Sequence, residues 1–568
     1  MDTNLIPPPP GQRRRRERPL STAEQVDRTI DGLTIPNLLR RNATESADAP
    51  ALSSGPGPDA VTLTWAQLRS EVGAATRGLS ALGLDRGERM LIMMSKRPEH
   101  WIVDLAATHL GALPCTLYDT LSTDEIRFIA QHSRASVVVL EGAEQMRRWQ
   151  PLLAELPDVR AFVVLDEQQI PPGDARFVSY ADLRGDGRRA DYDSTFEKLT
   201  DAVSPQDPLT LVYTSGTTGN PKGALYSHRS TVLHAYASAL PNVLNVGAID
   251  TVLPVVPMFH VNAWGLPYSV LLAGAKLVLP GAQLDGKSLY ELFEGEGVTF
   301  SAGVPTVWLG LINYAIQNDL TFSTFRRTVI GGSACPPAMM DTLIDCFGVQ
   351  VIHGWGMTEM SPLGTTGGLL ARHRALPVER QRAILQKQGH AIYGVDMKIV
   401  DDLGAELPWD GQASGHLLVK GPWIIARYFR DEGGDPLVDG WFPTGDVATI
   451  DPDGFMQITD RSKDVIKSGG EWIGSIDIEN IAMAHPAVLQ AACIAMAHPK
   501  WDERPLLLVV RKPGQEIGRE EMLQWFEGRI AKFWMPDDVV FVEALPIGGT
   551  GKVQKNKLRE QFKDHRVA

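Results

Sequence analysis

The hydrophobic pattern of this chain alternates between helix-like and strand-like segments. Apolar residues recur at helical spacing over 68–82, and the apolar run 90–94 that follows is typical of a buried strand. Helical spacing returns over 101–110, where Gly111 ends it, and another strand-like run covers 113–117. Such β–α alternation predicts a largely parallel sheet, joined by right-handed crossovers and covered by helices on both faces.

The alternation continues through most of the chain. Ser122 and Glu125 form a capping-box signature that predicts a helix through His132, and a strand-like run follows over 136–140. Further strands are expected at 251–256, 276–279, 299–302, 328–330 and 349–352. We therefore predict a large α/β domain.

The pattern changes toward the C-terminus. Alternating residues with glycine turns around 393–400 and 416–419 predict a small barrel or meander. Beyond residue 461 the chain carries strand-like runs at 489–495 and 506–510 and a helical pattern over 519–533. This last segment has the length of a separate small α+β domain.

The composition narrows the class of protein. At 568 residues the chain is too long for one hydrophobic core, so two or more domains are expected. The net charge of -13 argues against general binding of nucleic acid, because polyanion binders carry an excess of basic residues. The four cysteines lie far apart without metal-ligand spacing, which predicts reduced thiols in a cytoplasmic protein. No apolar run reaches membrane-spanning length, so only a peripheral membrane contact stays open.

The first residues differ from the rest. A proline run at 7–10 precedes an arginine-rich cluster at 13–18, without the apolar segment that a secretory signal requires. We interpret residues 1–34 as a disordered tail, and the alternative is a tether to nucleic acid or anionic lipid.

The stretch 213–223 has the composition of a phosphate-binding loop. It combines Ser and Thr hydroxyls with several glycines, and Pro221 presents Lys222. Small residues let backbone N–H groups and hydroxyls converge on a polyanion, while the lysine supplies a positive charge. An apolar run at 209–212 and a helical pattern at 227–239 flank the stretch, so we expect a strand-to-helix turn of the kind that holds ligands in α/β proteins. The alternative is a flexible Ser/Thr/Gly surface loop.

Other separated stretches also carry unusual residue chemistry. They are 257–260, 331–334, 354–359, 441–446, 460–464 and 549–552. In this order and spacing, together with 213–223, they resemble the adenylate-forming superfamily of acyl-CoA synthetases, peptide-synthetase adenylation domains and firefly luciferase. The resemblance extends from Ile35 to Phe562. The stretches 259–265, 354–359 and 468–473 look most like the fatty acyl-CoA synthetases of medium to long chain.

The resemblance implies an α/β fold in two parts. A large N-terminal domain over 35–460 would hold parallel-rich sheets, helices and a small β-barrel-like subdomain. A small mobile α+β domain over 461–568 would follow, with a hinge at 460–464 that contains Lys463.

The resemblance also implies a two-step reaction. The carboxylate of an acid displaces pyrophosphate from ATP to give an acyl–AMP anhydride, and the thiol of CoA then attacks the acyl group. The first step brings two anions together, so catalysis is mostly positioning and charge neutralisation, with Mg2+ bound to the phosphates.

By resemblance, residues from four stretches bind ATP. They are Thr214, Ser215, Gly216, Thr217, Thr218, Gly219, Lys222, Gly354, Trp355, Gly356, Asp446 and Arg461. The loop hydroxyls and Lys222 would hold the β- and γ-phosphates, and the two oxygens of Asp446 would accept both ribose hydroxyls. A turn-forming role is the alternative for Asp446, and Trp355 would either shorten the acyl pocket or stack on adenine.

Four residues are the catalytic candidates by resemblance. Glu359 would bind Mg2+, Thr358 would donate to the α-phosphate, and Lys552 would reach between the substrate carboxylate and that phosphate. Without the resemblance, Glu359 would be interpreted as a solvated loop carboxylate and Lys552 as an exposed lysine. In a second domain orientation, Lys467 and the neighbouring residues Ser468, Gly469 and Gly470 would face the site, where paired glycines allow close approach of CoA.

The acid itself would bind among less distinctive residues. The candidates are His260, Trp264, Trp308, Gly331, Gly332, Gly354 and Met360. Trp264 resembles a gating tryptophan of long-chain relatives, and simple core packing is the alternative. His260 would contact the acyl or thiol tunnel, or serve as a structural hydrogen-bonding group.

Three functions are compatible with these motifs. The leading hypothesis is an AMP-forming ligase that joins a medium- or long-chain fatty acid, or an aryl acid, to CoA. A second is an adenylating enzyme with another acceptor or acid, such as a carrier protein, an amine or nitrite. A third is a non-catalytic binding or scaffold protein on the same fold. A homodimer stays open in each case, and nucleic acid is not an expected partner.

Overall fold

A computed structural model describes residues 33–55, 60–186, 193–214, 220–468, 471–548 and 553–565. The predicted tail therefore lies outside the described residues except for its last two positions. So do several of the predicted site residues: Ser215, Gly216, Thr217, Thr218, Gly219, Gly469, Gly470 and Lys552.

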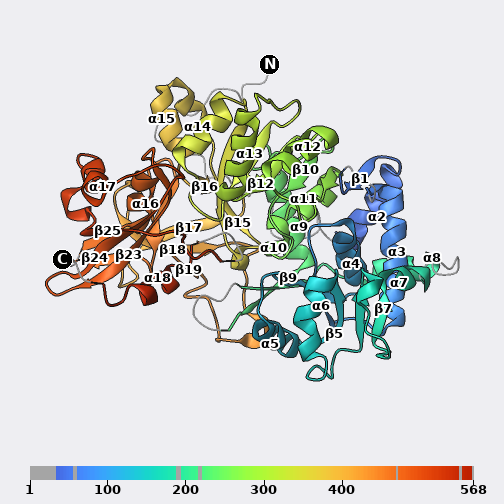
Figure 1. Cartoon of the computed structure of the whole chain (residues 1–568). Helices are drawn as coiled ribbons and strands as arrows, with labels where there is room; N and C mark the ends of the chain where they lie inside the picture. The colour runs from blue at the N-terminus through green and yellow to red at the C-terminus, as the bar shows by residue number, and fades with distance from the viewer. Residues whose placement is uncertain are drawn as a thin grey trace, which may run out of the picture.

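A parallel sheet of five strands follows the first helices (Figure 1). Its order is β4 (Leu113–Thr116), β3 (Arg89–Met93), β5 (Ala135–Leu140), β6 (Ala161–Val164) and β7 (Phe177–Ser179). Alternate residues of β3 enter different cores, because successive strand side chains point to opposite faces. Met90 packs in the cluster of α3 (Trp65–Ala81) and α4 (Pro98–His109), whereas Leu91 packs in that of α5 (Thr123–Ser133) and α6 (Ala143–Trp149). The predicted parallel sheet with helices on both faces is confirmed.

A second sheet of nine strands lies beside the first, mostly in green and yellow in Figure 1, with the two strands from the N-terminal region in blue. Its order is β16 (His390–Ala391), β15 (Leu363–Thr366), β14 (Gln350–Gly356), β13 (Arg327–Ile330), β12 (Phe300–Gly303), β10 (Thr251–Pro254), β11 (Lys276–Val278), β1 (Pro50–Ser53) and β2 (Thr62–Thr64). The run from β14 to β1 is parallel. All five strands predicted between residues 251 and 352 belong to this run.

Helices cover both faces of the second sheet. One face packs against α12 (Gly286–Glu296), α13 (Pro305–Gln317) and α14 (Pro337–Asp345), which share a core with Leu253. Val252, the preceding residue of β10, packs instead with α9 (His228–Ala239) and α11 (Leu266–Ala273). The remaining helices of this part are α2 (Ile35–Glu45), α7 (Tyr180–Asp186), α8 (Asp193–Ala202), α10 (Val261–Trp264) and α15 (Val378–Leu385).

The expected strand-to-helix turn at 213–223 is wrong. The stretch joins β8 (Pro208–Tyr213) to β9 (Gly223–Ser227), an antiparallel partner that the sequence did not reveal. The strand β9 is only five residues long, and Ser227 at its end is also the N-cap of α9, so the helical pattern concealed the strand. The loop is therefore the tip of a hairpin, and the helix begins one strand later.

Two further β-sheets follow in the C-terminal part, drawn in orange and red in Figure 1. The predicted small β-structure is an antiparallel meander of β17 (Asp396–Val400), β18 (Ser414–Lys420), β19 (Phe442–Ile450) and β20 (Met456–Arg461). The last sheet contains β22 (Glu471–Ile473), β21 (Ile466–Ser468), β24 (Asp502–Arg511), β23 (Val488–His498) and β25 (Asp538–Phe541). It packs with α16 (Ser475–Met483), α17 (Arg519–Phe526) and α18 (Lys555–Gln561).

One predicted helix in the last domain is too long. The helical pattern over 519–533 forms a helix only as far as Phe526. Gly528 then adopts a φ of +73°, a left-handed conformation that ends a helix, and the apolar residues beyond it pack from an irregular segment. None of the helices in the described ranges is long and apolar enough to cross a membrane.

A buried hydroxyl group links the hairpin of β8 and β9 to the first sheet. Thr210 Oγ1 donates to the carbonyl of Pro114 in β4 at 2.8 Å. We predict that Thr210→Val, which keeps the shape but leaves that carbonyl unpaired, lowers the free energy of unfolding by about 1–3 kcal/mol. Thr210→Ser should retain most of the stability. Urea unfolding followed by circular dichroism measures both variants, and equal midpoints for Thr210→Val and the parent would show that the bond contributes nothing.

Candidate functional site

The neck of the phosphate-loop hairpin is closed by two hydrogen bonds. The amide of Thr214 donates to the carbonyl of Lys222 at 2.8 Å, and the amide of Lys222 donates to Thr214 Oγ1 at 3.2 Å. Thr214 therefore directly precedes the stretch 215–221, and Lys222 directly follows it. The hairpin thus brings Thr214 and Lys222 to the same end of the two-stranded sheet of β8 and β9.

Glu359 lies in a short turn after β14 and is almost fully buried. Its Oε1 accepts a hydrogen bond from the hydroxyl of Tyr428 at 2.8 Å, and its carbonyl accepts from the amide of Ile425 at 2.9 Å. Burial raises the pKa of Glu359, while the Tyr428 hydroxyl and the positive charges of Lys222 and Arg461 lower it. The carboxylate thus faces cations and a hydrogen-bond donor in a site that excludes most water.

Thr358 precedes this carboxylate and is anchored through its backbone. Its carbonyl oxygen accepts a short hydrogen bond from the hydroxyl of Tyr226 in β9. The turn that carries Thr358 and Glu359 is thereby tied to the strand that begins directly after Lys222. Tyr226 and Tyr428 were not predicted, because a lone tyrosine outside a motif gives no sequence signal.

Asp446, Trp355 and Arg461 meet at the junction of the second sheet and the meander. The indole Nε1 of Trp355 donates to Asp446 Oδ2 at 2.9 Å. Arg461 is paired with Asp446 across β19 and β20, and its Nε lies 3.6 Å from Asp446 Oδ1. Gly354 and Gly356 flank Trp355 in β14. These candidates therefore converge, although they come from three separate stretches of sequence.

Most acyl-pocket candidates also lie together. The rings of His260 and Trp264 are 6.4 Å apart, and His260 Nδ1 lies 3.4 Å from the hydroxyl of Tyr118. The Trp264 ring packs over Gly331 and Gly332, where a Cβ would come within 3.4 and 3.5 Å of it. The Trp264 indole therefore lies against the backbone of Gly331 and Gly332, beside Gly354 of β14.

Met360 is buried next to this group of residues. Both Met360 and Trp355 pack against Gly364, where a Cβ would clash with either side chain. Met360 therefore packs within the same turn that contains Thr358 and Glu359.

The segment that carries Trp264 has an unusual backbone. Val261, Asn262, Ala263 and Trp264 all have φ between +50° and +57°, so four successive residues without the freedom of glycine are left-handed. This conformation costs energy for each such residue and is concentrated at functional sites in proteins. The hydrogen bond from Asn262 Nδ2 to the Tyr268 hydroxyl, at 2.5 Å, helps to hold it.

Trp308 is placed apart from the other acyl candidates. It is fully buried on α13, with its ring 5.8 Å from Phe325 and 6.2 Å from Phe293 in the core beneath α12 and α14. Its indole nitrogen has no partner among the described residues. The structure thus groups Trp308 with a packed aromatic core rather than with Trp264.

The C-terminal candidates have contacts within their own sheet. Lys467 donates its amide to Glu503 at 2.8 Å, and its ammonium lies 6.0 Å from the ring of Trp472. Ser468 Oγ accepts from Arg504 at 3.3 Å. Lys463 is exposed beside the buried Asp464, and partial desolvation lowers its pKa. These contacts hold the strand that leads to Gly469 and Gly470, which lie outside the described residues.

A buried ion pair that the sequence did not reveal lies three residues after Lys552. The ammonium of Lys555 is 2.7 Å from Glu479 Oε1 and 2.5 Å from Ser475 Oγ. Ser475 in turn donates its amide to Asp460 at 2.6 Å. Four residues later on α18, Arg559 forms a short ion pair with Asp464. Helix α18 is therefore joined by charge to both α16 and the segment 460–464.

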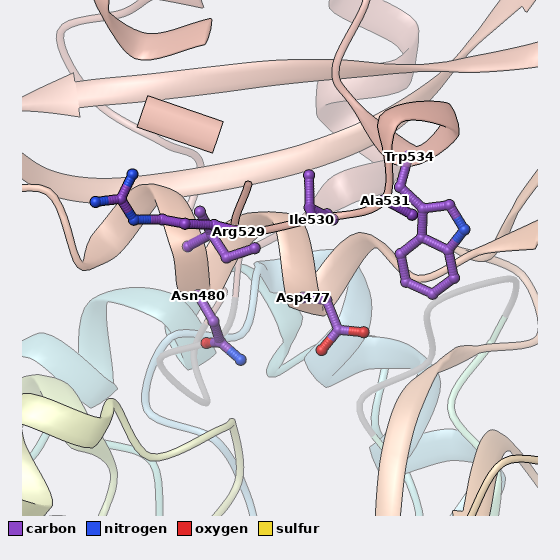
Figure 2. Close-up of a pocket in the computed structure, with 7 residues that line it drawn as sticks. Asp477, Asn480, Arg529, Ile530, Ala531 and Trp534 are labelled. Atoms are coloured by element: carbon purple, nitrogen blue, oxygen red, sulfur yellow. The ribbon is translucent and has the colours of Figure 1, made fainter. Parts of the chain in front are cut away.

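A separate pocket of about 360 Å³ opens on the last domain. Figure 2 shows Asp477 and Asn480 from α16 on one side and the segment from Arg529 to Trp534 on the other. None of the predicted site residues lines this pocket. It is therefore distinct from the convergence around Glu359.

Two family models and several known proteins match this chain. The family model of the AMP-binding enzymes matches residues 39–429, and that of the AMP-binding enzyme C-terminal domain matches residues 477–552. The 3-methylmercaptopropionyl-CoA ligase of Ruegeria lacuscaerulensis is 45% identical over 509 residues, which are 88% of this chain and 92% of that one. The medium-chain-fatty-acid–CoA ligase of Ectopseudomonas oleovorans is 44% identical over 509 residues, 88% and 90% of the two chains.

Solved structures share the fold. The anthranilate CoA ligase AuaEII in complex with anthranoyl-AMP superimposes with a TM-score of 0.80 at 23% identity, over 93% of this chain and 97% of that one. The chain belongs to the family of AMP-binding enzymes. Within that family it is an AMP-forming acyl-CoA ligase, the class that its relatives at more than 40% identity represent.

The buried pair of Lys555 and Glu479 allows a test of how the last domain is held together. We predict that Glu479→Gln lowers the free energy of unfolding by about 3–5 kcal/mol, because it leaves a buried ammonium without its counter-charge. Glu560→Gln is the control, because the pair of Glu560 and Lys563 is exposed and its loss should leave the free energy of unfolding almost unchanged. Equal urea midpoints for the two variants would contradict the role of the buried pair.

Proposed function

We propose that this ligase activates a medium- or long-chain carboxylic acid with ATP and transfers it to CoA. The observation that carries the proposal is the convergence of Lys222, Glu359 and Asp446 from three distant stretches. Trp264 lies nearby, against Gly331 and Gly332. A cation, a buried carboxylate and a second carboxylate are the groups that phosphates, a metal and a ribose require. The named acids of the Ruegeria and Ectopseudomonas relatives support an aliphatic substrate.

The residues present fit a divalent cation such as Mg2+. Glu359 offers a hard carboxylate oxygen beside the positive charges of Lys222 and Arg461, and the phosphates of ATP would supply further ligands. When bound, the ion would neutralise phosphate charge. Glu359 would hold it, and Thr214 and Lys222 would orient the β- and γ-phosphates from the base of the hairpin.

The remaining groups would place the nucleotide and the acid. Asp446 would accept the ribose hydroxyls while the indole of Trp355 fixes one of its oxygens, and Arg461 would approach from the junction. Thr358 would donate its hydroxyl to the α-phosphate. The acyl chain would lie along Trp264, Gly331 and Gly332, whereas Trp308 would act through packing.

We propose that the two half-reactions use different faces of the last domain. Lys552 would neutralise charge between the carboxylate and the α-phosphate, and Lys467 with residues 468–470 would approach the acyl–AMP in the second step. The segment 460–464 would be the hinge, because Asp464 and Asp460 link it to α18 and α16. We also propose that the domain boundary lies between residues 460 and 461. A cytoplasmic location and a homodimer are part of the same proposal.

An acid panel tests the proposed substrate. Purified protein is incubated with ATP, Mg2+, CoA and acids from two to eighteen carbons together with aryl acids, while AMP and thioester are measured separately. We expect thioester and AMP in equal amounts, with the highest kcat/KM for an aliphatic acid of medium or long chain. Release of AMP without thioester would favour another acceptor, and no turnover of ATP with any acid would favour a binding protein.

Two lysine variants test the division of labour. We expect Lys552→Ala to slow acyl–AMP formation by about 100-fold or more, because it removes a cation from the transition state, while thioester formation from supplied acyl–AMP persists. Lys467→Ala should show the reverse pattern. Lys563→Ala, which changes an exposed lysine just after α18, is the control and should leave both steps unchanged. Equal losses in both half-reactions for either variant would contradict alternation between two orientations.

A further inference from the structure

Tyr428 lies between the two charged groups that the proposed reaction needs most. Its hydroxyl donates to Glu359 Oε1 at 2.8 Å. The ammonium of Lys222 lies over the ring of Tyr428, with Nζ 5.0 Å from the ring centroid. One side chain thus contacts a carboxylate through its edge and a cation through its face, which matches the charge distribution of a phenol.

The backbone around Tyr428 is fitted to the same two partners. Tyr428 forms an antiparallel bridge with Ala224 in β9, two residues after Lys222. Three residues earlier, the amide of Ile425 donates to the carbonyl of Glu359 at 2.9 Å. The segment 425–428 therefore spans from the Glu359 turn to the strand that follows the phosphate loop.

Gly433 completes the binding site for the Lys222 ammonium. A Cβ on Gly433 would lie 2.9 Å from Lys222 Nζ, and the residue has a φ of +82°. A side chain here would displace the ammonium and strain the backbone, so only glycine allows this approach. The ammonium is consequently held between the ring of Tyr428 and the backbone of Gly433.

Lys222 and Glu359 carry opposite charges, and both lie next to Tyr428. The described residues include no ion pair within 4 Å between Lys222 and Glu359, and each of the two contacts Tyr428 instead. A direct ion pair would occupy the carboxylate oxygens and the ammonium hydrogens that a metal and phosphates would otherwise contact. The phenol of Tyr428 occupies the place where the side chains of Glu359 and Lys222 would meet.

We propose that Tyr428 is a positioning residue that holds Glu359 and Lys222 at a fixed separation, so that both are available to the metal and the phosphates of ATP. The inference rests on the proposed function of this site. It assigns the hydroxyl to Glu359 and the ring to Lys222, and these two contributions are separable by substitution. Simple packing of a tyrosine would give no such separation.

Three variants separate the contributions. Tyr428→Phe removes the hydroxyl and keeps the ring, Tyr428→Leu removes both, and Tyr393→Phe is the control because Tyr393 is 78% exposed. Binding of a non-hydrolysable ATP analogue is measured by calorimetry in Mg2+ and in EDTA. Adenylation is followed by pyrophosphate exchange over a range of Mg2+ concentrations, and thermal unfolding is recorded for every variant.

We expect Tyr428→Phe to raise the Mg2+ concentration for half-maximal exchange by about 10-fold, because a hydrogen bond to a charged group is lost. Its binding of the analogue in EDTA should match that of the parent. Tyr428→Leu should show the same Mg2+ defect and should also bind the analogue in EDTA about 3-fold more weakly, because Lys222 loses the ring. Tyr393→Phe should match the parent in all measurements.

Two results would overturn the inference while leaving the proposed function intact. One is a Tyr428→Phe protein with the Mg2+ dependence of the parent. The other is an equal loss of binding in Mg2+ and EDTA for both variants, together with a lower unfolding temperature, since that pattern indicates packing alone. If the parent protein itself neither binds the analogue nor exchanges pyrophosphate, the proposed function fails first and the inference fails with it.

Discussion

The burial of the Glu359 carboxylate is the constraint on which the rest of the site depends. A carboxylate taken out of water is unstable unless cations and donors surround it, and burial alone raises its pKa. Tyr428, Lys222 and Arg461 meet that requirement, and they come from the meander junction and the hairpin. The site therefore exists only when the two sheets and the meander are assembled around one residue.

This dependence explains how three architectural units share one function. The hairpin of β8 and β9 supplies Lys222, β14 and the turn after it supply Trp355 and Glu359, and the meander supplies Asp446. Each unit has its own hydrogen-bond ladder, but the polar contacts between them are few and specific. The three units also share one hydrophobic core, which contains Tyr226 of the hairpin, Trp355 of β14 and Leu417 of the meander.

The last domain is organised by charge in a similar way. Helix α18 begins three residues after Lys552 and is joined by Lys555 to Glu479 and by Arg559 to Asp464. The proposed catalytic lysine thus precedes a helix that is coupled to the proposed hinge. Such a coupling would let Lys552 and the segment 467–470 exchange places together in the proposed change of domain orientation.

The sequence by itself determined the α/β class, most strands of both parallel sheets and the motifs of adenylate formation, because periodicity and local motifs are readable along the chain. It placed Lys222, Glu359 and Asp446 in one site only through family resemblance. Tertiary structure decided what depends on distant partners: that the phosphate loop ends a hairpin, that Trp308 packs in a core, and that Tyr428 joins Glu359 to Lys222. Strand β9 and Tyr428 have no local signal, since their roles come from neighbours far away in sequence.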